Sequence, residues 1–111
     1  MTINEYQKEC LRTESGMSKE YPRLLNGLMG LNGEAGECID ILKKAMFQGH
    51  DLDTEHIALE LGDVAFYIAV SADAIGYKFS DILQKNIDKR RLRYPNGFEA
   101  ERSIHRREGD I

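Results

Sequence analysis

The spacing of apolar residues most constrains the fold, because it follows a helical period along most of the chain and no strand pattern competes with it. The clearest stretch is residues 23–47, where apolar side chains recur every three or four positions. This pattern predicts one long helix that stops at Gly49, a residue type that commonly closes helices. The sequence therefore predicts an all-α fold.

Capping residues and helix breakers place three further helices. Thr2 and Glu5 match a capping box, Asp53 or Thr54 can cap a helix in the middle of the chain, and Ser80 can cap another. Four helices joined by short loops predict a four-helix bundle. The apolar faces are wide for so short a chain, so we expect oligomerisation with a second copy to complete the core. The predicted helices cover residues 2–14, 23–47, 55–74 and 80–94.

Length and charge indicate one domain with a basic end. At 111 residues the chain has the size of a single domain, which we place at residues 1–98. We expect residues 99–111 to form a basic, flexible C-terminal tail that is extended or partly disordered. The net charge of −4 is uneven, because Lys and Arg concentrate in residues 85–107 and the remainder is acidic. This distribution suits an anionic ligand that arrives with divalent cations, and it also suits self-association between opposite ends.

The sequence gives no sign of secretion or of membrane insertion. The first residues lack the apolar stretch of a signal peptide, and the longest apolar run is too short to span a membrane. Cys10 and Cys38 are too few for a disulfide framework. We therefore expect two free thiols and a cytoplasmic protein.

Two acidic motifs carry the clearest chemical signal. Glu34 and Glu37 are three residues apart, as are Glu60 and Asp63, and this spacing puts each pair on one helix face with Cβ atoms roughly 5–6 Å apart. A single such pair is commonly a solvated face. Here both pairs have apolar neighbours, and burying unpaired carboxylates is very costly, so a cation is the obvious partner. Oxygen ligands favour Mg²⁺, or Mn²⁺, over zinc.

Two other features refine the kind of site. A di-iron carboxylate bundle would require glutamates followed by histidine at E-x-x-H spacing, and the chain has none. Asn86, Lys89 and Arg93 follow i, i+3, i+7 spacing and share one helix face. That face is either an ordinary solvated surface or a clamp for polyphosphate oxygens.

Together these motifs resemble the MazG-like members of the all-α nucleoside triphosphate pyrophosphohydrolase superfamily. The family signature is E-x-x-E followed after a gap by E-x-x-D, and Glu34, Glu37, Glu60 and Asp63 match it position by position. The likeness covers most of residues 3–98. It includes Asn4-Glu5-Tyr6-Gln7, Gly30-Leu31, Lys43-Lys44 and Arg93-Tyr94-Pro95-Asn96-Gly97-Phe98.

The resemblance implies Mg²⁺-dependent hydrolysis of a nucleoside triphosphate between its α- and β-phosphates, yielding a monophosphate and pyrophosphate for nucleotide-pool house-cleaning or regulation. It also implies a homodimer or homotetramer. The four acids would then be metal ligands, and Glu34 would also activate the attacking water. The phosphate-binding residues would be Asn86, Lys89 and Arg93, and the base contacts would be Tyr21, Leu24 and Tyr67, for each of which packing is the alternative role.

Two other classes of function remain as alternatives. A non-catalytic helical interaction or regulatory protein would keep the same bundle, but it would not need four intact acids. A nucleic-acid binder would use residues 85–107, and the acidic body and the small number of aromatic residues expected on the surface argue against it. The sequence thus favours a metal-dependent enzyme that acts on a nucleotide.

Overall fold

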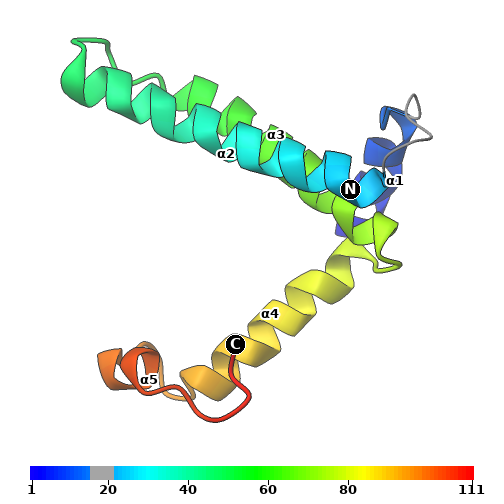
Figure 1. The fold of residues 1–111 in the computed structure, drawn as a ribbon, viewed down its shortest axis with the longest axis vertical. Coiled ribbons are helices and arrows are strands. Elements are labelled where there is room, and N and C mark those ends of the chain that lie inside the picture. Colours follow the sequence, from blue (N-terminus) through cyan, green and yellow to red (C-terminus); the bar gives the residue numbers. More distant parts are fainter. Residues whose placement is uncertain (16–21) are drawn as a thin grey trace. The chain divides into compact units, whose positions relative to one another are not determined.

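A computed structural model describes residues 1–15 and 22–111, and its secondary structure is helical, as the sequence predicts (Figure 1). The chain divides into two compact units, Met1–Phe79 and Ser80–Ile111. Across the described residues, none of the helices combines the length and the apolar character needed to cross a membrane. The helices are α1 (Ile3–Arg12), α2 (Arg23–Phe47), α3 (Thr54–Ala74), α4 (Phe79–Arg93) and α5 (Ala100–Ile104).

The helix ends confirm most of the capping predictions. The Glu5 N–H donates to Thr2 Oγ1 at 3.1 Å and the Thr2 N–H donates to the Glu5 carboxylate at 2.9 Å, which completes the capping box of α1. The Asp53 carboxylate accepts from the His56 N–H at 2.9 Å and caps α3. Just beyond α2, Gly49 has a φ of +74°, a conformation that glycine adopts without strain.

The predictions for the C-terminal third need correction. Helix α4 begins at Phe79, one residue before the predicted cap, so Ser80 lies in its first turn. Residues 100–104, predicted to be extended or partly disordered, form the short helix α5. Contacts about one turn apart accompany it: His105 Nδ1 lies 2.6 Å from Glu101 and Arg102 Nε lies 3.8 Å from Glu99. These contacts join polar side chains. The segment therefore has no apolar periodicity from which the helix could be predicted.

Helices α2 and α3 lie side by side and form the frame of the first unit (Figure 1). Their backbones approach closely where α2 carries glycine. Gly30 faces the ring of Tyr67, and Gly27 faces the side chain of Ser71, so that a Cβ atom at either glycine would collide with α3. The Tyr67 ring also packs edge-to-face with Phe66, at 5.0 Å between centroids.

Helix α1 is attached to the far end of α3 by a buried amide. The Gln7 Nε2 donates to the carbonyl oxygens of Ala69 and Tyr77, both at 3.1 Å, and its Oε1 accepts from the Phe79 N–H at 2.9 Å. Around it lies the buried apolar core of the unit, which is small. That core consists of Cys10, Ala69, Val70 and Phe79.

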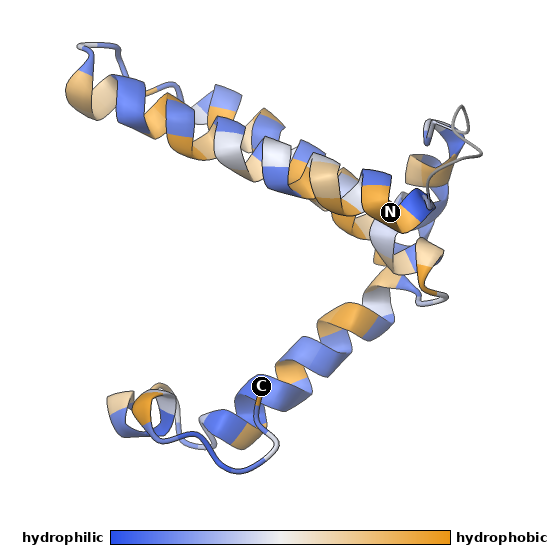
Figure 2. Ribbon diagram, viewed as in Figure 1, coloured by the Kyte–Doolittle hydropathy of each residue, from blue (hydrophilic) through white to orange (hydrophobic). Residues whose placement is uncertain are grey.

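A long stripe of α2 stays outside this core. Leu28, Ile39, Leu42 and Met46 recur at helical spacing, and the exposed fractions of Leu28, Ile39 and Met46 are 48%, 63% and 66%. We call these four residues the α2 apolar face; apolar residues recur along α2 in Figure 2. An exposed apolar stripe of this kind commonly marks an interaction surface.

The two environments of the α2 glycines predict opposite effects of the same substitution. Gly30→Ala places a methyl group against the Tyr67 ring, whereas Gly33→Ala meets no atom within 4 Å. Both variants share the helix-propensity gain of up to about 1 kcal/mol. The difference in their free energies of unfolding therefore isolates overpacking, and we expect Gly30→Ala to be less stable than Gly33→Ala by about 1–3 kcal/mol. Urea denaturation followed by circular dichroism measures this difference, and equal stabilities would contradict the packing described.

Candidate metal centre

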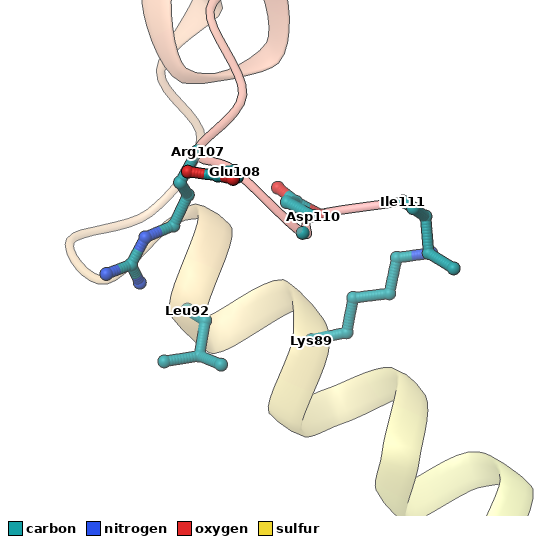
Figure 3. Close-up of a pocket in the computed structure, with 7 residues that line it drawn as sticks. Lys89, Leu92, Arg107, Glu108, Asp110 and Ile111 are labelled. Atoms are coloured by element: carbon teal, nitrogen blue, oxygen red, sulfur yellow. The ribbon is translucent and has the colours of Figure 1, made fainter.

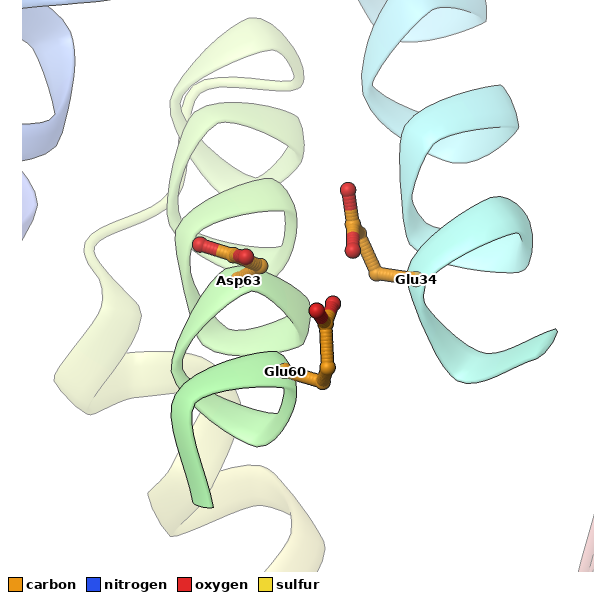
Figure 4. Close-up of side chains that lie close together, drawn as sticks. All are labelled: Glu34, Glu60 and Asp63. Atoms are coloured by element: carbon orange, nitrogen blue, oxygen red, sulfur yellow. The ribbon is translucent and has the colours of Figure 1, made fainter. Parts of the chain in front are cut away.

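Three acidic side chains converge between α2 and α3. Each of Glu34, Glu60 and Asp63 offers one carboxylate oxygen, and these atoms all lie within 4.8 Å of one another. Figure 4 shows Glu34 reaching from α2 towards the Glu60 carboxylate on α3, with Asp63 further along the same helix. Two neighbouring helices therefore supply the group, which we call the carboxylate cluster.

The cluster is placed by the contact between Gly30 and Tyr67. Glu34 lies one turn after Gly30 on α2, and Asp63 lies one turn before Tyr67 on α3. Because residues four apart lie on the same helix face, the helix approach at this contact also determines how far apart the two carboxylates are. Glu60 shares the face of Asp63 through its i, i+3 spacing.

A hydrogen bond between two of the carboxyl groups, and after it their mutual repulsion, shape the electrostatics of the metal-free cluster. The pKa of Glu34 is raised, first by its hydrogen bond with Glu60, then by partial desolvation and by the negative charges of Glu60, Asp63 and Glu37. The Glu60 side chain is only 16% exposed. A proton on Glu34 relieves part of this repulsion, and a divalent cation would relieve more. The donor set, made of carboxylate oxygens, fits Mg²⁺ or Mn²⁺.

Glu37, the fourth predicted ligand, is not part of the carboxylate cluster. It lies about one turn beyond Glu34 on α2, and its side chain is exposed. Its charge still contributes to the raised pKa of Glu34. The structure therefore gathers three of the four predicted ligands, and a ligand role for Glu37 stays a prediction.

Two residues next to the cluster were not predicted as part of a site. His56 Nε2 lies 3.2 Å from Glu60 Oε1, and the i, i+4 spacing of this pair was the only sequence signal for it. The Tyr6 hydroxyl donates to the Gly62 carbonyl at 3.3 Å, across 56 residues of sequence that no local pattern connects. Desolvation by burial and a hydrogen bond with Cys10 raise the pKa of Tyr6 to about 12, which keeps the hydroxyl protonated as a donor.

The predicted phosphate-binding residues all lie on α4, in the second unit. Asn86 and Lys89 are exposed, but Arg93 is buried. Arg93 donates to both carboxylate oxygens of Asp110, from Nε at 2.8 Å and from Nη2 at 2.6 Å. No sequence pattern indicates this partner, which lies in the predicted tail. The phosphate-binding role of the three residues stays a prediction.

The predicted base contacts have separate positions. Tyr21 lies outside the described residues. Leu24 is half-buried near the start of α2, and the ring of Tyr67 packs against Gly30. For Tyr67 the structure therefore shows the alternative role, which is packing.

The raised pKa of Glu34 predicts a pH-dependent stability. The folded chain holds this proton more tightly than the unfolded chain, so the benefit is complete below the ordinary glutamate pKa of about 4.3 and is lost as the pH rises through the raised value. Glu34→Gln removes the charge at every pH. We expect this variant to melt a few degrees above the wild type at pH 7.5 without metal, with the gain vanishing in acid.

Glu55→Gln, on the first turn of α3 and outside the cluster, serves as the control for a change of charge alone. Melting curves from pH 4 to pH 8 in EDTA give the comparison. A gain for Glu34→Gln that does not depend on pH, or an equal gain for Glu55→Gln, would contradict the electrostatic explanation.

Comparisons with known proteins agree with the motifs. The MazG nucleotide pyrophosphohydrolase domain matches residues 24–98, a span that runs from α2 past the end of α4. The "Gene 37 protein" of Mycobacterium phage L5 is 34% identical over 73 residues, which are 62% of this chain and 64% of that protein, so this chain spans less than two thirds of that relative. No solved structure matches the chain. Because the matching domain covers more than half of the chain and includes the whole carboxylate cluster, the protein belongs to the MazG nucleotide pyrophosphohydrolase family.

Proposed function

We propose that this protein is a Mg²⁺-dependent nucleoside triphosphate pyrophosphohydrolase that cleaves an NTP or dNTP between the α- and β-phosphates. The observation that carries the proposal is the convergence of Glu34, Glu60 and Asp63 within a domain of this family. The products would be a nucleoside monophosphate and pyrophosphate. Such a reaction serves nucleotide-pool house-cleaning or regulation.

In this proposal the carboxylate cluster holds the metal, with Glu37 as a further ligand and with Mn²⁺ as a possible substitute for Mg²⁺. A bound divalent cation supplies Lewis acidity, which neutralises phosphate charge and favours ionisation of water. Glu34 also accepts the proton of the attacking water, because a carboxylate positioned beside the cation can act as a general base.

Neighbouring residues hold the cluster in position. His56 contacts Glu60 and limits its side-chain rotation, while the Tyr6 hydroxyl attaches α1 to α3 within the E-x-x-D motif. Outer-shell partners of this kind typically change metal affinity or activity by about 10–100-fold when they are removed. Orientation of the carboxylates therefore depends on residues beyond the motif itself.

The backbone beside the cluster leaves space for a substrate. A Cβ atom at Gly33, Gly36 or Gly62 would meet nothing within 4 Å, in contrast to Gly30 and Gly27. These three glycines border the acids of both motifs in the sequence. Their open surroundings support close approach of a hydrated cation and a triphosphate to the helix backbones.

We also propose that the α2 apolar face is covered by a second copy of the chain, giving a homodimer or a dimer of dimers. The first unit has a small buried core of its own, whereas Ile39 and Met46 are about two-thirds exposed at 63% and 66%. Two equivalent stripes packed together would remove these side chains from water, and this burial drives association.

The catalytic proposal predicts pyrophosphate release from at least one common NTP or dNTP in the presence of Mg²⁺. Glu60→Gln should lower kcat/KM by more than about 100-fold, since loss of a direct ligand exceeds the usual cost of losing an outer-shell partner. Glu55→Gln, on the same helix but outside the cluster, should retain activity. Pyrophosphate assays across a nucleotide panel test this, and no release from any nucleotide would favour a non-catalytic helical protein instead.

The oligomer proposal predicts that one charge on the α2 apolar face disrupts the assembly. Ile39→Lys should shift the protein to monomers in analytical ultracentrifugation, because a lysine at a packed apolar seam must be desolvated. Ile104→Lys is the matched control, since Ile104 is also exposed, at 71%, but lies on α5. A monomeric wild type, or an oligomer unaffected by Ile39→Lys, would contradict the proposal.

A further inference from the structure

The guanidinium of Arg93 is already occupied by a carboxylate of the same chain. Asp110 lies 17 residues further along and accepts two hydrogen bonds from Arg93, at 2.8 Å and 2.6 Å. Both side chains are removed from solvent, with exposed fractions of 10% and 8%. A bidentate pair of this kind uses the same two donor directions with which arginine binds a phosphate group.

The surroundings of Asp110 are cationic. Its pKa is lowered, first by the hydrogen bonds from Arg93 and then by the positive charges of Arg93, Arg106 and Lys89. Arg93 Nη2 also donates to the Ile111 main-chain oxygen at 3.4 Å. The group around Asp110 thus has the composition of an anion site, with a buried arginine at its centre and further cations nearby.

An open pocket adjoins this pair. It has a volume of about 480 Å³ and lies between the second half of α4 and the C-terminal segment. Figure 3 shows Lys89 and Leu92 on α4 below Glu108, Asp110 and Ile111. The pocket gives a small anion access to the cations beside Arg93 without unfolding of α4.

We propose that Asp110 is an internal phosphate mimic that occupies the anion site of Arg93 and must be displaced when a phosphate group of the substrate binds there. This inference rests on the proposed function, because it assigns regulation to a residue of the proposed phosphate-binding face. The tether of 17 residues gives Asp110 an effective concentration on the order of millimolar. The apparent affinity for phosphate is reduced by the fraction of chains in which Arg93 is occupied.

A purely structural ion pair would behave differently. Removing one partner of such a pair leaves the other buried and uncompensated, which lowers stability without improving the binding of an external ligand. A phosphate mimic instead competes with the ligand, so that its neutralisation strengthens anion binding. The two roles therefore predict opposite responses of affinity to the same substitution.

The first test uses inorganic pyrophosphate titrated calorimetrically into the full chain in EDTA, so that the carboxylate cluster holds no metal. Asp110→Asn should bind pyrophosphate about tenfold more tightly than the wild type, as expected if Arg93 is occupied in about nine-tenths of chains. Glu101→Gln is the matched control, because it removes the same charge from the same unit at an exposed position of α5 that neither lines the pocket nor touches Arg93, and its affinity should equal that of the wild type. Equal affinities for Asp110→Asn and Glu101→Gln would overturn the proposal.

A second measurement uses the wild type and does not depend on how the variant folds. The Asp110 N–H donates to the Arg107 carbonyl at 3.0 Å. This amide hydrogen should therefore exchange slowly with solvent while Asp110 is paired with Arg93. Saturating pyrophosphate should accelerate its hydrogen exchange by releasing Asp110 from Arg93. Unchanged exchange at saturation would overturn the proposal.

Activity separates this proposal from the catalytic one. With Mg²⁺ and the best nucleotide, Asp110→Asn should lower KM by about the factor found for pyrophosphate and leave kcat unchanged. If no variant hydrolyses any nucleotide but Asp110→Asn binds pyrophosphate more tightly, the catalytic proposal fails and the mimic stands. If hydrolysis occurs and KM does not change, the mimic proposal fails alone.

Discussion

The close approach of α2 and α3 is the constraint on which the rest of the first unit depends. Helices normally pack 8–10 Å apart according to the side chains at the contact, and here the contact side chains include glycine at positions 27 and 30. The Tyr67 ring fills the space over Gly30, one turn from both Glu34 and Asp63. A bulkier residue at position 30 would separate the helices where the two carboxylates must meet.

This packing holds together charges that repel each other. Proteins can keep like charges close together when other contacts fix the position of the backbone. For this reason, residues with strongly perturbed pKa values often mark functional sites. Besides the packing of α2 on α3, two hydrogen bonds from α1 hold α3 in position. The Gln7 amide donates to the Ala69 carbonyl, and the Tyr6 hydroxyl donates to the Gly62 carbonyl. The repulsion is left for a proton or a cation to relieve, and it is therefore a source of affinity for cations.

The features that could be predicted from the sequence are those that depend on residues a few positions apart. Helix ends at Thr2 and Asp53 follow from capping, and the two acidic pairs follow from i, i+3 spacing. The glycines show where such reasoning stops, because Gly30 and Gly33 look alike in sequence, yet one faces Tyr67 and the other faces open space. Contacts between distant positions, such as Arg93 with Asp110, produce no periodic signal and could not be predicted. The short helix at residues 100–104 was missed because it has no apolar periodicity, so the prediction of an extended or partly disordered tail was wrong there.

The two groups of charges differ in what ligand binding must overcome. The carboxylate cluster has unrelieved negative charge, so a cation adds a favourable interaction and displaces at most a proton. Arg93 already has a carboxylate partner, so a phosphate group gains only the difference between its own interaction and that of Asp110. Because phosphate carries more charge and more acceptor oxygens than a carboxylate, this difference favours the polyphosphate, but it discriminates against weaker anions. In this proposal, competition from the Asp110 carboxylate makes Arg93 selective for strongly charged ligands.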